Sequence, residues 1–157
     1  MKLLFLDVDG VLNSTKFSYE LATDKLEKYK SLSFPLDSFD YRAIELVNYI
    51  LDNTDAKLVI SSDWRFDDEL EPCLLYHGLK HKIYGRTPYD KHYRRNIEIE
   101  TFISKENENI ESYCIIDDID NWFNDEQLKH MVKTSTFEGL TKKLADKAIK
   151  ILNNEQE

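Results

Sequence analysis

The feature that most constrains the fold of this chain is a set of three short apolar runs, each followed at once by acidic or hydroxyl residues. The runs cover residues 2–6, 57–60 and 113–116. They are nearly continuous rather than alternating, which is typical of central strands in a parallel sheet, because both faces of such strands are buried. Residues 131–134 are a candidate for a short fourth strand.

Between these runs, apolar residues recur at helical spacing. The predicted helices cover residues 43–51, 66–76, 95–104 and 140–152. Strands that alternate with helices are typical of βαβ units, so we expect an α/β protein with a mostly parallel sheet and helices on both sides. In the stretch 14–41, residues 19–29 are a candidate helix and Pro35 indicates a flap or loop.

Length and composition predict a single domain over residues 1–157, because 41% of the residues are apolar, enough to fill one core. The four glycines are too far apart for a dinucleotide-binding or P-loop pattern. The two cysteines form no metal-binding or disulfide framework. No apolar run is long enough for a signal sequence or a membrane span, so we expect a cytoplasmic protein without a membrane partner.

The charge of the chain is unevenly distributed. A net charge of -9 argues against broad binding to a nucleic-acid backbone, since each phosphate contact needs a cation from the protein. In the segment 77–95, however, the lysines and arginines face a single acid, Asp90. This segment is either a local anion site or a solvated basic loop.

Acidic and hydroxyl residues stand where the three runs end. Asp7 and Asp9 follow the first run, Ser61 follows the second, and Asp117 and Asp118 follow the third. Because the carboxyl ends of parallel strands lie on one edge of a sheet, where ligands bind, we expect these side chains to converge. Clustered carboxylates need a cation to remain ionised. Oxygen ligands without histidine or cysteine favour Mg²⁺ over zinc, with a substrate phosphate completing the site.

The Asp-x-Asp-Gly sequence at 7–10 indicates a division of labour. Asp7 directly follows a buried strand, so its position is more firmly fixed than that of Asp9. Asp7 is therefore the candidate nucleophile that attacks phosphorus. Asp9 is the candidate general acid and base. Gly10 permits a sharp turn. The alternative is an ordinary turn after a strand.

The chain resembles the haloacid dehalogenase-like (HAD) phosphohydrolases over roughly residues 2–152. Its matches to the four motifs of that family are residues 7–13, Ser61, Arg94 or Arg95, and Asp117-Asp118. It is most similar to the HAD phosphatase domains of RNA-repair proteins, through residues 61–65, 87–88, 95–99 and 139–141. The resemblance implies a three-layer α/β sandwich with a Rossmann-like sheet, capless or with a minimal flap. It also implies a magnesium-dependent phosphatase with an aspartyl-phosphate intermediate.

The resemblance implies roles for the residues at the strand ends. Asp7 corresponds to the nucleophile and a metal ligand, and Asp9 to the acid/base, with its backbone carbonyl also on the metal. Asp118 is preferred over Asp117 as the second metal carboxylate, while Asp117 would orient it or a metal-bound water. Ser61 would donate a hydrogen bond to the transferring phosphoryl group.

The basic residue of the third motif is ambiguous by one position. Arg95, at a predicted helix start, is the choice for neutralising the phosphate, and Arg94 is the fallback. Ser62, Trp64 and Arg65 are further substrate-binding candidates, with the Trp and Arg placed to stack on and clamp a base or sugar. The alternative for the Trp is that it covers the helix that follows.

Two further expectations concern the surroundings of the site. Glu98 is expected to pair with Arg95 or to cap its helix, and the alternative is an ordinary acid of the first helical turn. The stretches between motifs are too short for a full cap domain, so an open site is expected. In this family, open sites go with macromolecular substrates or with a partner acting as a lid.

The leading functional hypothesis is a phosphomonoester hydrolase acting on a phosphorylated substrate such as a 3′ or 5′ nucleic-acid end. A nucleotide or sugar phosphatase and a non-catalytic HAD-fold binding or regulatory module are the alternatives. A phosphoacceptor receiver domain is disfavoured, because its acceptor Asp belongs at the end of a middle strand, where this chain has Ser61. Protein partners and the physiological substrate are left open.

Overall fold

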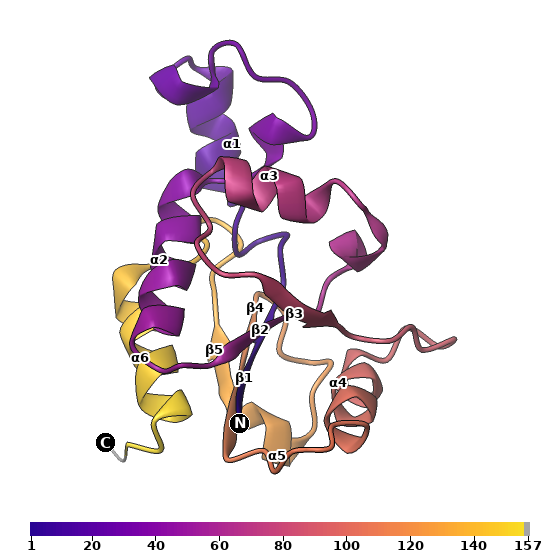
Figure 1. Cartoon of the computed structure of the whole chain (residues 1–157). Coiled ribbons are helices and arrows are strands. Elements are labelled where there is room, and N and C mark those ends of the chain that lie inside the picture. Colours follow the sequence, from indigo (N-terminus) through magenta and orange to yellow (C-terminus); the bar gives the residue numbers. More distant parts are fainter. Residues whose placement is uncertain (156–157) are drawn as a thin grey trace.

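The apolar runs form the middle of one parallel sheet, as the sequence predicts. The computed structural model of the protein describes residues 1–155. Its strands are β1 (Lys2–Leu6), β2 (Lys57–Ile60), β3 (Ile83–Arg86), β4 (Ser112–Asp117) and β5 (Met131–Lys133). They lie in the order β3-β2-β1-β4-β5, and every neighbouring pair is parallel (Figure 1). The predicted α/β fold class is confirmed.

The strand that the sequence analysis missed is β3. It lies at the edge of the sheet beside β2, and its residues are half-buried or exposed, so it lacks the continuous apolar run of the central strands. Gly85 allows a close approach of Phe102, because a Cβ at this glycine would lie 2.8 Å from the phenylalanine ring. The basic segment 77–95 therefore contains a strand as well as a loop.

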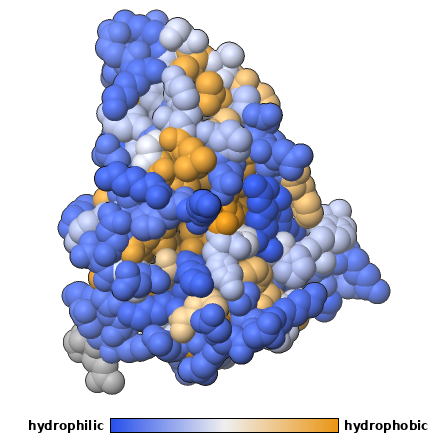
Figure 2. Space-filling model, viewed as in Figure 1, coloured by the Kyte–Doolittle hydropathy of each residue, from blue (hydrophilic) through white to orange (hydrophobic). Residues whose placement is uncertain are grey.

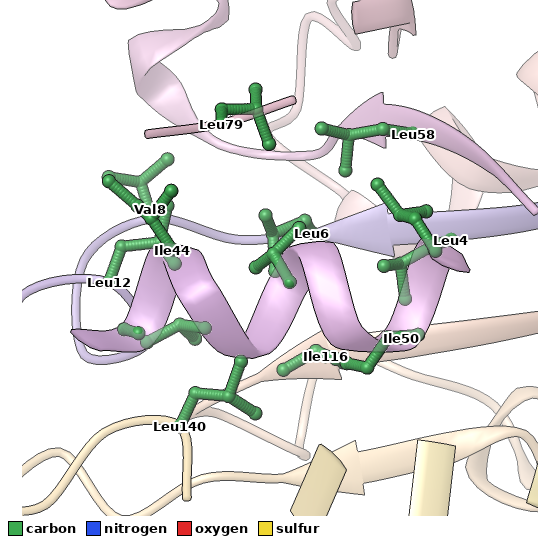
Figure 3. Packing of buried hydrophobic residues seen from close by; sticks show 14 of the residues in the cluster. Leu4, Leu6, Val8, Leu12, Ile44, Ile50, Leu58, Leu79, Ile116 and Leu140 are labelled. Atoms are coloured by element: carbon green, nitrogen blue, oxygen red, sulfur yellow. The ribbon is translucent and has the colours of Figure 1, made fainter. Parts of the chain in front are cut away.

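Helices cover both faces of the sheet. They are α2 (Tyr41–Asp52), α3 (Leu70–Tyr76) and α6 (Lys142–Leu152) around the larger core, with α4 (Arg95–Ser104) and the short α5 (Asp125–Leu128) on the other side. Alternate residues of β1 serve the two cores: Leu4 and Leu6 belong to the larger one, Leu3 and Phe5 to the smaller one. Figure 3 shows Leu4 and Leu6 packed around α2. This is the predicted three-layer arrangement.

The helix predicted at 66–76 begins later than expected. α3 starts at Leu70, and a separate 3-10 turn, η3 (Asp63–Phe66), precedes it. The reason is Pro72, which lacks an N–H and whose ring would clash with the carbonyl of Asp68 if the helix extended further back.

The segment between β1 and α2 is a small flap. It contains α1 (Thr15–Ala22) and two 3-10 turns, η1 (Glu27–Tyr29) and η2 (Leu36–Ser38). The helix expected at 19–29 is therefore wrong in its bounds: the Ser14 side chain caps α1 by accepting from the Phe17 N–H at 3.0 Å, and the helix ends at residue 22. The Tyr29 hydroxyl, which accepts from the Tyr41 N–H at 2.9 Å, ties the flap to α2. Within residues 1–155 the site has this minimal flap and no larger cap.

Strand register aligns the residues that follow β1, β2 and β4. Leu6 pairs with residues 60 and 116 in the two neighbouring strands. The Asp7 N–H donates to the Ile116 carbonyl at 2.9 Å, and the Ser61 N–H donates to the Leu6 carbonyl at 2.9 Å. Ser61, Asp7 and Asp117 thus lie in a row. After β3 the chain returns to the other side of β1 to form β4, so this row lies at the topological switch point, where open α/β sheets bind ligands.

One face of the molecule carries mostly polar side chains. Figure 2 shows hydrophilic residues over most of this face, with apolar residues in patches near its top and through its middle. Among the described residues, none of the helices has the length and apolar character needed to cross a membrane.

Candidate active site

Three carboxylates meet where β1 and β4 end. One oxygen from each of Asp7, Asp117 and Asp118 lies within 4.8 Å of the other two. Asp7 is 6% exposed and Asp117 is 1% exposed, whereas Asp118 is partly exposed. The cluster therefore combines two buried acids with one that solvent can reach.

Arg95, the first residue of α4, is the cation within this cluster. Its Nη1 atom lies 3.1 Å from Asp7 Oδ1 and 2.8 Å from Asp117 Oδ2. Arg94 is instead the extended residue that precedes the helix, and its exposed guanidinium pairs with Asp90 at 3.1 Å. The helix start thus turns one arginine inward and leaves the other outside the cluster.

The carboxylates carry more negative charge than Arg95 neutralises. Burial, followed by repulsion from Asp117, raises the pKa of Asp7 to about 8, although Arg95 opposes the shift. Burial also raises the pKa of Asp117. Asp118 has no basic partner among residues 1–155. A second cation is required for all three acids to be ionised together, and an all-oxygen set of this kind fits Mg²⁺.

Asp118 is held by two features of neighbouring loops. Thr136, in the turn after β5, donates its hydroxyl to Asp118 Oδ2 at 2.8 Å. Gly10 has a φ of +79°, and a Cβ at this position would lie only 2.2 Å from Asp118 Oδ2. The glycine is therefore needed for the approach of the carboxylate as well as for the turn. The sequence analysis missed Thr136, for which no spacing signal exists.

Asp9 is exposed and lies outside the group of three carboxylates. Its Oδ1 atom accepts from Asn13 Nδ2 at 2.8 Å and from Trp64 Nε1 at 3.1 Å. The Trp64 ring packs on Phe39, with ring centroids 4.9 Å apart. The Trp expected to bind substrate thus orients Asp9, and Asn13 is a second positioning residue that the sequence analysis did not identify.

The two serines after β2 have different environments. Ser61 is 1% exposed, and its hydroxyl has no hydrogen-bond partner among residues 1–155. Because buried hydroxyls are normally paired, this orphaned group at the row of strand ends fits a donor reserved for a ligand. Ser62, expected to contact substrate, instead caps η3 by accepting from the Trp64 N–H at 3.2 Å.

Arg65 lies in a buried ion pair and not in the carboxylate cluster. Its Nη2 atom is 2.7 Å from Glu98 Oε1, and both side chains are 3% exposed. A second nitrogen donates to the Ser62 carbonyl at 3.1 Å. The expectation that Glu98 pairs with Arg95 is wrong; its partner is Arg65. This pair ties the loop after β2 to α4.

Two pockets adjoin the cluster. The larger, here called the acidic cleft, has a volume of about 620 Å³ and is lined by Asp9, Asp63, Trp64, Phe66, Asp67 and Asp68. The smaller, here called the aromatic pocket, has a volume of about 140 Å³ and is lined by Asp63, Tyr93, Arg95, Glu98 and Trp122. Asp63 lines both, so the two pockets are adjacent.

A protein-family model matches most of the chain. The model describes a HAD domain in Swiss Army Knife RNA repair proteins, and it matches residues 3–145. The matched region contains every residue of the carboxylate cluster, Arg95 and the two serines. Searches of curated proteins and of solved structures found no match.

Proposed function

The chain belongs to the family of HAD domains found in Swiss Army Knife RNA repair proteins, and from that premise we propose that it is a magnesium-dependent phosphatase of phosphorylated nucleic-acid ends. The observation that carries the proposal is the grouping of Asp7, Asp117 and Asp118 around Arg95 at the switch point of the sheet. Phosphoryl transfer is catalysed mainly by positioning and by charge stabilisation, which this grouping is suited to provide.

Asp7 is the proposed nucleophile. A carboxylate oxygen forms a bond to phosphorus while the bond from phosphorus to the leaving oxygen breaks, giving an aspartyl-phosphate. Two features of the fold support this role. The residue directly follows a central strand, and Arg95 holds one of its oxygens at 3.1 Å.

Asp9 is the proposed general acid and base. Its carboxyl proton passes to the leaving oxygen in the first step, and the carboxylate then takes a proton from the water that attacks the phosphorus. That attack releases inorganic phosphate and restores Asp7. Asn13 and Trp64 orient the carboxylate, and its exposure gives it access to water.

Mg²⁺ would be held by Asp7, Asp118 and the backbone carbonyl of Asp9. When bound, the ion neutralises charge on the phosphate and on the carboxylates. Asp117 is held by Arg95 and by the Ile119 N–H, which donates at 3.0 Å, and this suits it to an orienting role.

Ser61 and Arg95 are the proposed phosphate-binding groups. The serine hydroxyl is an unused buried donor, and the guanidinium carries donors that match phosphate oxygens. Arg65 and Ser62 are assigned to positioning, because their side chains are committed to Glu98 and to the η3 cap.

The family and the openness of the site support the proposed substrate class. Relatives named for RNA repair indicate a phosphorylated nucleic-acid end. The flap that covers the edge is small, with α1 as its main element, and this leaves room for a polymer. A nucleotide or sugar phosphate remains the comparison substrate.

Turnover of an aryl phosphate, with and without Mg²⁺, tests the reaction. Asp7→Asn is expected to abolish turnover and Asp9→Asn to reduce it severely. The exposed Asp52, far from the cluster in sequence, supplies the control variant Asp52→Asn, which is expected to act like the unmodified protein. Equal activity in Asp7→Asn would refute the mechanism. A panel of 3′- and 5′-phosphorylated RNA, nucleotides and sugar phosphates then tests the substrate class.

A further inference from the structure

The two pockets beside the cluster differ in charge, which decides where a polyanionic strand can lie. The acidic cleft carries four aspartates, and among residues 1–155 no arginine or lysine lines it. The aromatic pocket contains Arg95, whose guanidinium also contacts Asp7. Its acid Glu98 pairs with Arg65 at 2.7 Å, and its exposed acid Asp63 lies 4.0 Å from the same guanidinium. A phosphate at Asp7 therefore has a favourable neighbourhood on one side only.

Two aromatic side chains line the favourable pocket and are unusually exposed. Tyr93 is 67% exposed and Trp122 is 43% exposed. They come from different loops: Tyr93 lies in the loop that joins β3 to α4, and Trp122 lies in the loop that joins β4 to α5. In Figure 1 the β3–α4 loop projects from the body of the molecule. Exposed rings beside a phosphate site are suited to stacking on nucleobases.

The β3–α4 loop is also the basic part of an acidic protein. Residues 89–95 include Lys91, Arg94 and Arg95 against the single acid Asp90. Lys91 is exposed, and the partner of Arg94 is Asp90. Because Asp90 neutralises Arg94, the positive charge that the loop presents outside the cluster is that of the exposed Lys91.

Hydrogen bonds and a ring contact within the protein hold the loop. The Asp90 side chain accepts from the backbone N–H groups of His92 and Arg94, at 3.0 and 3.1 Å, and the Asp90 N–H donates to Glu98 at 3.1 Å. The Tyr89 and Tyr93 rings meet edge to face, with centroids 5.6 Å apart. A ring that is already held in place loses little conformational entropy on binding.

We propose that the aromatic pocket binds the nucleobase next to the phosphorylated end of single-stranded RNA, by stacking against Tyr93 and Trp122. The strand then continues over residues 89–95 and not through the acidic cleft. This inference rests on the proposed function, since it requires the terminal phosphate to lie at Asp7. Stacking tolerates any base, so all four terminal bases are expected to bind with similar affinity.

Equilibrium binding to an uncleaved complex tests the pocket. In the Asp7→Asn background with Mg²⁺, the anisotropy of a short phosphorylated RNA labelled at its other end gives the Kd. Tyr93→Ala and Trp122→Ala are each expected to raise the Kd on the order of tenfold. The control is Tyr76→Ala, because Tyr76 is 61% exposed and lines neither pocket, so its Kd is expected to be unchanged. If the two pocket variants bind as the control does, or if the parent does not bind the RNA, the inference is wrong.

An abasic terminal nucleotide separates stacking from other effects. The abasic RNA is expected to bind the parent as weakly as the intact RNA binds Tyr93→Ala/Trp122→Ala. In that double variant, removing the terminal base is expected to weaken RNA binding no further. If the missing base costs both proteins equally, the base lies elsewhere. Should an alanine variant fail to fold, Tyr93→Leu and Trp122→Leu remove the ring face while keeping apolar volume, and the same loss is expected.

A separate experiment tests the path of the RNA strand across the protein surface. Asp67→Asn/Asp68→Asn in the acidic cleft is expected to change the Kd no more than the remote pair Asp52→Asn/Glu45→Gln. A much larger tightening in the cleft variant would place the strand there and overturn the inference. A phosphopeptide provides a further test. If its binding depends on Tyr93 and Trp122 and the binding of RNA does not, the inference is also overturned.

Aryl-phosphate turnover distinguishes the two levels of the proposal, because an aryl phosphate has no neighbouring nucleotide. Absent turnover in the unmodified protein refutes the phosphatase and not the binding result. Normal turnover, with RNA binding that is indifferent to Tyr93 and Trp122, refutes the pocket alone.

Discussion

Two arginines near the same sheet edge are paired in opposite ways. Arg65 meets one buried carboxylate, Glu98, at 2.7 Å, with both side chains 3% exposed, and the exposed Asp63 lies 4.0 Å away. Arg95 faces Asp7 at 3.1 Å and Asp117 at 2.8 Å, with Asp118 in the same cluster. The first centre is balanced in charge, and the second has an excess of negative charge.

This difference separates an ion pair that supports structure from one prepared for a ligand. In a protein interior, paired charges are tolerated, whereas surplus charge is costly. Burial, and after it repulsion from Asp117, raises the pKa of Asp7 to about 8. Perturbed carboxyls of this kind concentrate at functional sites, because the missing counter-charge arrives with a metal or substrate.

The largest expected effect comes from breaking the balanced pair. Arg65→Met leaves Glu98 buried without its cation, and removing one partner of a buried pair typically costs about 3–5 kcal/mol. The free energy of unfolding from urea titration measures the loss. Catalysis per folded molecule is expected to fall less, since Arg65 contacts no residue of the carboxylate cluster.

Arg95→Met is the counterpart at the unbalanced centre. We expect it to cost far more activity than stability, and its stability loss to shrink when Mg²⁺ is added. If Arg65→Met proves mild and Arg95→Met strongly destabilising with Mg²⁺ present, the contrast between the two centres is wrong.

The next effect is a pH dependence confined to the unbalanced centre. The folded pKa of Asp7, about 8, lies above its ordinary value of 3.8, so between these values the folded state binds more protons than the unfolded state. The stabilisation is complete below about pH 4 and is lost as pH rises through about 8. Metal-free stability is therefore expected to fall by about 1 kcal/mol per pH unit between pH 5 and 7 on account of this group.

Asp7→Asn isolates that contribution. The unfolding free energies of the unmodified protein and this variant are measured without metal at several pH values. The difference between them should show the predicted fall of about 1 kcal/mol per pH unit. Saturating Mg²⁺ should flatten it, because the ion favours the ionised carboxylate. A difference that does not vary with pH would contradict the electrostatic argument.

The central row of the site was predictable from the sequence because its residues follow continuous apolar runs. Asp7, Ser61 and Asp117 come one residue after or at the end of buried strands, and parallel register aligns them. By contrast, β3 (Ile83–Arg86) is a half-buried edge strand, and its residues lack that pattern.

Contacts between distant loops could not be predicted. The pairing of Arg65 with Glu98 joins residues 33 positions apart; both lie in segments shared with the RNA-repair domains, but neither segment indicates that the two side chains pair. Thr136 reaches Asp118 from a turn after β5. The choice between Arg94 and Arg95 depended on which one occupies the first helical position, and a boundary error of one residue reverses it.

Gly10→Ala tests the role of Asp118, the third carboxylate of the unbalanced centre. A left-handed φ costs a non-glycine residue about 1–2 kcal/mol, and here the added Cβ would also lie 2.2 Å from Asp118 Oδ2. Gly78, with a φ of +102° and nothing within 4 Å of an added Cβ, provides the control Gly78→Ala. Both variants place alanine at a positive φ, and Gly10→Ala is expected to lose more stability because Asp118 must also move. Weaker Mg²⁺ activation is expected in Gly10→Ala alone, and equal activation in the two variants would show that Asp118 is not displaced.

The smallest expected effect concerns the single hydroxyl that orients Asp118. Thr136→Val removes a donor at 2.8 Å, and a side-chain hydrogen bond of this kind contributes about 1 kcal/mol. Because groups that orient metal ligands affect affinity, the Mg²⁺ concentration for half-maximal activity is expected to rise about tenfold. Thr15→Val is the matched control, since the Thr15 hydroxyl contacts the same turn at the Thr136 carbonyl and not Asp118. An unchanged Mg²⁺ requirement in Thr136→Val would place the ion on Asp7 and Asp117 instead, and would make Asp118 the spectator of the three carboxylates.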